Sequence, residues 1–175
     1  MIPMKQLILA SNAYLKKQPR LLAVLSTLLT VSTLLFYLSF GVQCLLLFTF
    51  SIEKTILFIT YNAVVFIGVT LLRKVINRKR PYEALNVTPV ISKDTIGQSF
   101  PSRHAFSAWL ITFNWLILGA YMPYISFGVL FIIFSVIALI ICILRVCFTI
   151  HYASDVCAGA LIALIALIGY LTLLI

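Results

Sequence analysis

Six apolar runs, almost free of charged side chains, make up most of this chain. They cover residues 21–38, 39–51, 56–72, 104–121, 125–144 and 153–175. A helix needs about 17–25 apolar residues to cross the hydrocarbon core of a bilayer, and every run except 39–51 is long enough. The run 39–51 is short, and it fits a tilted helix, a re-entrant segment or one half of a hairpin with its neighbour.

The composition places these runs in lipid rather than in a soluble core. Hydrophobic residues make up 63% of the chain and charged residues only 10%, whereas a soluble domain carries about 25% charged residues. Only helices and closed barrels satisfy their backbone polar groups inside a bilayer. Because the runs are continuously apolar and do not alternate, we predict an all-α fold. This is a polytopic membrane helical bundle of about six transmembrane helices, in a single domain over residues 1–175.

The net charge of +9 comes from thirteen Lys and Arg residues against four acidic residues. In a membrane protein such an excess is typical of contacts with anionic lipid head groups, and it also fits an anionic substrate. A nucleic-acid partner is disfavoured, because no large soluble surface is left to carry a basic patch. Cysteine and histidine do not occur at the spacing of a metal site, so we predict neither a metal nor a cofactor.

Polar residues gather in a basic N-terminal segment, 1–20, and in one long polar stretch, 73–103. The N-terminal segment is expected to form a short helix at the membrane surface. Three polar clusters interrupt the bundle, at 73–80, 101–104 and 145–155. If successive helices alternate in direction, all three clusters lie on the same face of the membrane. We therefore expect them to form one site, with the stretch 73–103 carrying part of it.

The third cluster contains a histidine, an aspartate and an arginine. His151 and Asp155 are four residues apart, which places them on one helix face if the last helix begins near them. A carboxylate that accepts one imidazole proton leaves the other ring nitrogen as a nucleophile or base. Arg145, at the end of the preceding run, can bind a phosphate oxygen. The ordinary alternatives are a structural His–Asp pair and an arginine that reaches for the membrane surface.

The second cluster, Pro101-Ser102-Arg103-His104, opens an apolar run. Proline is favoured at the first helical position, and the free N–H groups that follow it bind anions. Ser102 adds a hydroxyl donor, and His104 is placed to give a proton to a leaving oxygen. The ordinary alternative is a capped helix start at the membrane surface.

The first cluster is a basic run that ends at a proline. Arg73 and Arg80 are seven residues apart, about two helical turns, so both project from nearly the same face if the helix continues to Pro81. Lys74 diverges from Arg80 by about 120°, which makes Lys74 an accessory at most. Alone, this run would fit a patch that binds lipid head groups. Together, the three clusters supply the cations, nucleophile and acid that phosphoryl transfer needs.

In order and spacing, the three clusters resemble the type-2 phosphatidic-acid phosphatase superfamily, which also includes vanadium haloperoxidases. The pattern of that family is K-x6-RP, then PSGH, then SR-x5-H-x3-D. The corresponding residues here are Arg73-x6-Arg80-Pro81, Pro101-Ser102-Arg103-His104 and Leu144-Arg145-x5-His151-x3-Asp155. Three positions depart from the pattern: Arg73 replaces lysine, Arg103 replaces glycine and Leu144 replaces serine. Arg103 would be strained if its backbone required a positive φ.

The resemblance implies a two-step mechanism without a metal. His151 attacks phosphorus and forms a phosphohistidine, Asp155 orients His151, and His104 protonates the leaving lipid oxygen before water hydrolyses the intermediate. The resemblance also implies which groups hold the phosphate: the side chains of Arg73, Arg80, Ser102 and Arg145, and the backbone N–H of Arg103.

These features favour a membrane enzyme that hydrolyses the terminal phosphate of a lipid. The candidate substrates are a polyprenyl diphosphate, similar to undecaprenyl diphosphate, and a phospholipid phosphate, either phosphatidylglycerophosphate or phosphatidate. Two alternatives stay open: transfer of the phosphate to another lipid or a sugar, and a non-catalytic protein that binds or transports lipid phosphates. A haloperoxidase is disfavoured, because a soluble bundle would not need this apolar surface.

The charges also predict sidedness. Six crossings would place both termini together, opposite the active site. The cations on the side of the termini would be Lys5, Lys16, Lys17, Arg20 and Lys54, and cations favour the cytoplasmic side. We therefore predict a multi-pass protein of the plasma (inner) membrane, with cytoplasmic termini and an active site on the periplasmic or extracellular side.

Overall fold

The computed structural model describes residues 4–91, 96–123 and 126–174. Within these ranges the chain forms helices and no strand. The helices are α1 (Met4–Lys16), α2 (Pro19–Phe50), α3 (Ile52–Ile76), α4 (Pro81–Ala84), α5 (Arg103–Tyr121), α6 (Gly128–Cys147) and α7 (Ala153–Thr172). In the described part of the chain, α2, α3, α6 and α7 are long and apolar enough to cross a membrane. The prediction of an all-α membrane bundle is confirmed.

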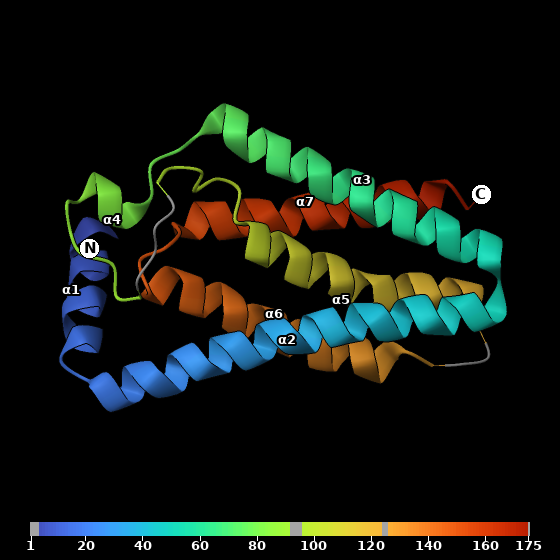
Figure 1. The fold of residues 1–175 in the computed structure, drawn as a ribbon, viewed down its shortest axis with the longest axis horizontal. Coiled ribbons are helices and arrows are strands. Elements are labelled where there is room, and N and C mark those ends of the chain that lie inside the picture. The colour runs from blue at the N-terminus through green and yellow to red at the C-terminus, as the bar shows by residue number, and fades with distance from the viewer. Residues whose placement is uncertain (1–3, 92–95, 124–125, 175) are drawn as a thin grey trace.

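The long helices α2, α3, α5, α6 and α7 run along the bundle, and α1 lies across one end, near α4 (Figure 1). Helix α5 is central: it packs mainly on α7 and α6, and it also contacts α2 and α3. Most of its side chains are buried, among them Phe106, Trp115 and Leu118. Because α5 is surrounded by other helices, it can carry polar groups that a lipid-facing helix could not.

Polar side chains tie the surrounding helices to α5. The amide of Gln43 on α2 donates to the carbonyl of Ile111 at 2.9 Å, and Asn114 on α5 donates to Asn62 on α3 at 3.1 Å. All three polar side chains are buried. A hydrogen bond between helices in a membrane contributes about 0.6–2 kcal/mol, so these bonds fix α2 and α3 against the central helix.

The helices that carry the polar clusters end or begin at the same end of the bundle (Figure 1). Helix α3 stops where Asn77 takes the left-handed conformation, with φ 41°, a common way for a helix to end. Helix α7 starts with a carboxylate cap, because Asp155, its third residue, accepts the N–H of Tyr152 at 3.0 Å. The stop of α3 and the starts of α5 and α7 thus bring the clusters together.

Helices α5 and α7 approach closely at Gly159. A Cβ atom there would lie 2.7 Å from the carbonyl oxygen of Ser102 and 3.0 Å from the backbone nitrogen of Phe106. Nearby, the N–H of Ser102 donates to the carbonyl of Asp155 at 2.8 Å. Glycine therefore lets the first turn of α5 lie directly against the first turns of α7.

The apolar segment 39–51 is not a separate crossing. Helix α2 continues through it as one helix of 32 residues, and the chain reverses at Ser51 into α3. The hydroxyl of Ser51 accepts the N–H of Lys54 at 3.4 Å, which caps α3. No proline occurs between Pro19 and Ser51, so nothing blocks the helix and it continues through Gly41 to Ser51.

The predicted placement of both termini opposite the active site is wrong. Helix α1 lies at the end where the clusters meet, whereas α7 finishes at the other end (Figure 1). Joining 39–51 to α2 removes one crossing, so the two ends of the described chain separate. Lys16, Lys17 and Arg20 therefore lie at the same end as the clusters, and their charge no longer supports an outward-facing site. The plasma membrane and the side that the site faces stay predictions.

Candidate active site

The three polar clusters surround one cavity of about 80 Å³. Its walls are formed by Arg73, Arg80, Gln98, Arg103, His104, Arg145 and His151. These residues include both histidines of the chain and every predicted phosphate-binding arginine. The accessory candidate, Lys74, is exposed and is not one of the residues that line the cavity. We call this space the arginine cavity.

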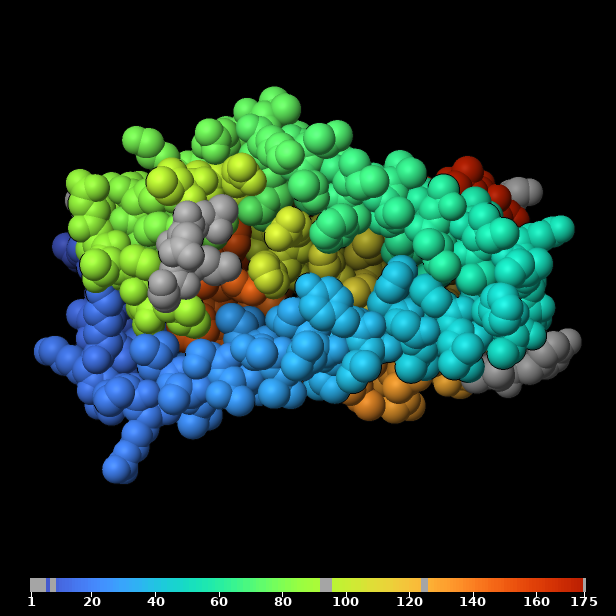
Figure 2. Space-filling model, in the orientation of Figure 1, coloured from blue at the N-terminus to red at the C-terminus, as the bar shows by residue number. Residues whose placement is uncertain are grey.

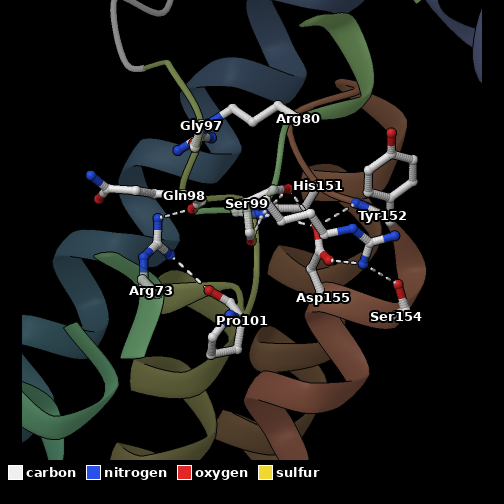
Figure 3. A network of polar contacts seen from close by, with 11 residues as sticks. Arg73, Arg80, Gly97, Gln98, Ser99, Pro101, His151, Tyr152, Ser154 and Asp155 are labelled. Carbon is white, nitrogen blue, oxygen red and sulfur yellow. Dashed lines mark hydrogen bonds and ion pairs between the residues drawn. The ribbon is translucent and has the colours of Figure 1, made fainter. Parts of the chain in front are cut away.

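Arg73 and Arg80 reach the arginine cavity by a route that differs from the predicted one. Helix α3 ends at Ile76 instead of continuing to Pro81, so the two side chains do not share a helix face. Both are buried. Arg73 donates to the carbonyls of Pro101 at 2.8 Å and Gln98 at 2.5 Å, and Arg80 donates from Nε to the carbonyl of Gly97 at 2.9 Å (Figure 3). These bonds wrap the loop 97–101 around the cavity.

The first turn of α5 supplies the second wall. Arg103 is the first residue of α5, and it is not among the described residues with a positive φ, so its replacement of glycine does not strain the backbone. Its exposed guanidinium lies 5.9 Å from the centre of the Phe66 ring. His104, the second residue of α5, lines the arginine cavity as predicted.

Two buried polar atoms in this region have no hydrogen-bond partner among the described residues. They are the hydroxyl oxygen of Ser102, just before α5, and Nε of Arg145, near the end of α6. Buried polar groups in folded proteins are nearly always paired. A donor held without a partner on the wall of a cationic cavity indicates that an anionic ligand completes the site.

His151 lies in the turn between α6 and α7, with only 2% of its surface exposed. Its Nδ1 donates to the carbonyl of Ser99 at 2.8 Å (Figure 3). The nearest oxygen of Asp155 is 3.6 Å from Nδ1, too far for a hydrogen bond. The two side chains lie within ion-pair distance, but they do not share a helix face as predicted, because α7 begins only at Ala153 and His151 precedes it. Ser99 fixes the tautomer, and Nε2 is the ring nitrogen left for the cavity.

The surroundings of His151 keep its ring neutral. Burial lowers the pKa of His151 to about 4; the charges of Arg80 and Arg145 act in the same direction, and Asp155 opposes them. At pH 7 the ring is therefore uncharged. An uncharged imidazole nitrogen is what a nucleophilic histidine requires.

Asp155 is fully buried, and both of its oxygens are bonded. One oxygen accepts the hydroxyl of Ser99 at 2.5 Å and the N–H of Tyr152, and the other pairs with Arg78 at 2.7 Å. Sequence reasoning missed both Ser99 and Arg78. The charge of Arg78, within the basic run, was a signal that pointed to it. Nothing about Ser99 distinguishes it in the sequence, because only the fold of the loop brings it to His151.

Together, the fold and the site define a helical membrane bundle with a cationic cavity that suits a phosphate group. The chain belongs to the PAP2 superfamily, whose family model matches residues 54–174. The matched range contains all three polar clusters, and it confirms the family resemblance of their motifs.

The fold is similar to a known crystal structure. That structure is a transmembrane PAP2-type phosphatidylglycerolphosphate phosphatase from Bacillus subtilis, with a TM-score of 0.68 and 23% sequence identity. The match covers 97% of this chain and 87% of that one. No curated protein matches the chain. At this level of identity, the likeness establishes the shared membrane fold.

Proposed function

We propose that this chain removes the terminal phosphate from a membrane lipid by forming a phosphohistidine on His151. The observation that carries the proposal is the arginine cavity itself, in which four arginines and both histidines meet. Fixed cations around a small cavity stabilise the charge that develops on a phosphoryl group during transfer. Because arginines supply the positive charge, we also propose that the reaction needs no metal ion.

The geometry suggests a role for each residue. Nε2 of His151 attacks phosphorus, the bond to the lipid oxygen breaks, and His104 gives that oxygen a proton. The ring of His151 becomes positively charged, and the carboxylate of Asp155, 3.6 Å away, stabilises it. Water then attacks the phosphohistidine and gives its proton to His104. The N–P bond breaks, which releases inorganic phosphate.

An apolar groove that starts at His104 supports a lipid as the substrate. Figure 2 shows a hollow between α2 and α3, with α5 at its floor. The part next to the arginine cavity, about 210 Å³, contains Arg103 and His104 among its lining residues, and a deeper and mainly apolar part has about 240 Å³. His104 therefore lies where the phosphate cavity meets the groove, which is where the leaving oxygen of a lipid would be.

Hydroxyl groups on α2 favour a phospholipid phosphate over a polyprenyl diphosphate. Ser26, Thr30 and Thr33 line a further cavity of about 400 Å³, to which His104 and Arg145 also contribute. Each hydroxyl donates to a carbonyl of its own helix at 2.8–3.1 Å, so its oxygen is left to accept. The glycerol of phosphatidylglycerophosphate offers a hydroxyl donor, whereas a prenyl chain offers none. We therefore propose phosphatidylglycerophosphate as the preferred substrate, which is also the substrate named for the similar Bacillus subtilis protein.

The test is phosphate release by the purified protein from phosphatidylglycerophosphate, phosphatidate and a polyprenyl diphosphate. We expect the fastest release from phosphatidylglycerophosphate, no effect of EDTA, and no release by His151→Ala. With substrate labelled in the terminal phosphate, the wild type should carry an acid-labile label that His151→Ala lacks. Equal release by His151→Ala would exclude the mechanism, and passage of the label to an added alcohol would indicate a phosphotransferase.

Substrate choice has its own matched pair of variants on α2. Thr33→Val removes a hydroxyl from the cavity wall, and we expect it to slow phosphatidylglycerophosphate hydrolysis more than phosphatidate hydrolysis. Thr27→Val is the control, because Thr27 is exposed on the same helix and is not one of the residues that line the cavity. If both variants affect both lipids equally, the hydroxyls do not select the substrate.

A further inference from the structure

Arg78 binds the buried carboxylate of the site from outside the arginine cavity. Its Nη1 donates to one oxygen of Asp155 at 2.7 Å and to the hydroxyl of Ser154 at 3.0 Å. The side chain of Arg78 is 40% exposed, whereas that of Asp155 is fully buried. Arg78 is not one of the residues that line the arginine cavity, so it approaches Asp155 from the solvent side.

The guanidinium of Arg78 is held in one orientation by the start of α7. Its central carbon lies 4.3 Å from the centre of the Tyr152 ring, in a cation–π contact. Tyr152, Ser154 and Asp155 are neighbours in the chain, and Figure 3 shows them around one network of dashed contacts. Arg78 itself comes from the segment between α3 and α4. It therefore ties that segment to the turn that carries His151.

This contact fixes the direction of the carboxylate. Arg78 occupies one oxygen of Asp155, while the hydroxyl of Ser99 and the N–H of Tyr152 occupy the other. The second oxygen is thereby held near His151, whose Nδ1 proton already goes to the carbonyl of Ser99. The charged groups around the carboxylate are Arg78, with Arg73 and Arg80 close enough to interact through their charge. Of these, Arg78 makes the direct ion pair.

We propose that Arg78 is a positioning residue that acts on His151 through Asp155 and does not contact the phosphate. The inference rests on the function proposed above, since it assumes that His151 is the nucleophile. In the resting site Arg78 holds the carboxylate at a fixed distance from the ring. When the ring gains positive charge on phosphorylation, the carboxylate is already in place and needs no reorganisation.

The experiment separates positioning from phosphate binding. Arg78→Gln is expected to lower kcat about 10- to 100-fold, the scale expected for a misplaced catalytic group. Inhibition by inorganic phosphate should stay within about twofold of the wild type, because no ligand to the anion is lost. Arg145→Gln, which removes a cation from the cavity wall, should weaken inhibition by phosphate strongly. Lys79→Gln is the matched control, because Lys79 is the exposed neighbour of Arg78.

A second comparison shows whether Arg78 acts through Asp155. In an Asp155→Asn background, Arg78→Gln should cause little further loss of kcat, because residues that act as a unit are not additive. Arg78→Lys should recover part of the rate, since it keeps the charge but loses the planar contacts. If the melting temperature of Arg78→Gln in detergent shows that this variant does not fold, Arg78→Lys replaces it in the experiment.

Three results would overturn the inference. They are a wild-type kcat for Arg78→Gln, weakened inhibition by phosphate equal to that of Arg145→Gln, and full additivity with Asp155→Asn. A failure of the proposed function looks different: His151→Ala would then keep its activity, whatever the behaviour of Arg78.

Discussion

Replacing Gly159 by alanine should separate the two halves of the site without changing any residue of the arginine cavity. The added Cβ would lie 2.7 Å from the carbonyl oxygen of Ser102, and an ordinary contact starts at 3.4 Å. The two closest atoms belong to the backbone of Ser102 and Phe106, at the start of α5, and not to the end of a flexible side chain. The first turn of α5 must therefore move by about 0.7 Å relative to α7.

That movement acts on both stability and rate. Overpacking between helices costs about 1–3 kcal/mol. The turn that moves carries His104, while His151 and Asp155 stay with the start of α7. A misplacement of about 1 Å can lower a rate about 100-fold, so we expect kcat to fall about 10- to 100-fold. The KM should change less, because α2 and α3, which form the two sides of the groove, are not displaced.

The assay is phosphate release, together with thermal melting in detergent. Gly119→Ala is the matched control, because Gly119 lies on α5 and no atom is within 4 Å of its added Cβ. That variant should keep full activity and gain about 0.5–1 kcal/mol, the usual advantage of alanine over glycine in a helix. If Gly159→Ala keeps the wild-type kcat and melting temperature, the close approach of α5 and α7 does not set the geometry of the site.

Three further predictions concern His104, His151 and the bond between α3 and α5. His104→Ala should lower the rate of hydrolysis of a lipid phosphate by about 100- to 10,000-fold. The loss should be smaller for an aryl phosphate, whose leaving group needs no proton. Equal losses for the two substrates would show that His104 is not the general acid. Because burial lowers the pKa of His151 from 6.5 to about 4, the unfolded chain binds the extra proton between these values. Stability should therefore fall by up to about 3 kcal/mol as the pH drops from 6.5 to 4, and melting curves of His151→Asn should show a smaller fall. Asn62→Leu and Asn114→Leu should couple by about 0.6–2 kcal/mol in a double-mutant cycle of melting, and simple additivity would deny the bond between α3 and α5.

The sequence was sufficient to predict the bundle and the arginine cavity, for a common physical reason. Charged groups at the edge of a membrane helix are costly, so they persist where they pair or bind. Arg145 and Asp155 interrupt apolar runs, and the structure buries both at the same end of the bundle. Their position along the chain therefore already indicated a shared site.

The number of crossings was harder to predict, because the chain is apolar, without a charged residue, from Leu21 to Phe50, the end of α2. Serine is a common capping residue, but α2 runs through Ser26, Ser32 and Ser39 and ends only at Ser51, so residue type alone did not mark the boundary. Dividing the segment at Ser39 added one crossing and reversed the deduced position of the N-terminus. One wrongly placed helix boundary thus reversed the predicted orientation, and the number of positive charges could not correct that error.

Helical spacing also failed wherever a functional residue lies in a loop. His151 precedes α7, so its spacing of four residues from Asp155 does not place both on one helix face. The hydrogen bond of Nδ1 goes to the carbonyl of Ser99, and Asp155 lies 3.6 Å away as an ion-pair partner. The conformation of the loop 97–101 brings Ser99 into the site. Such a loop has no periodic sequence pattern, so the position of Ser99 could not be predicted.

The hydrogen bonds of the arginines imply that they do not all have the same task. Arg73 commits its two terminal nitrogens to the carbonyls of Gln98 and Pro101, a forked contact that a single ammonium group cannot reproduce in the same geometry. This accounts for an arginine where the family pattern has a lysine. Arg145 instead keeps a buried nitrogen without a partner among the described residues. We therefore propose that Arg73 shapes the loop around the arginine cavity, and that Arg145 is the arginine that binds the phosphate. Loss of activity alone would not distinguish these tasks, whereas the affinity for inorganic phosphate would.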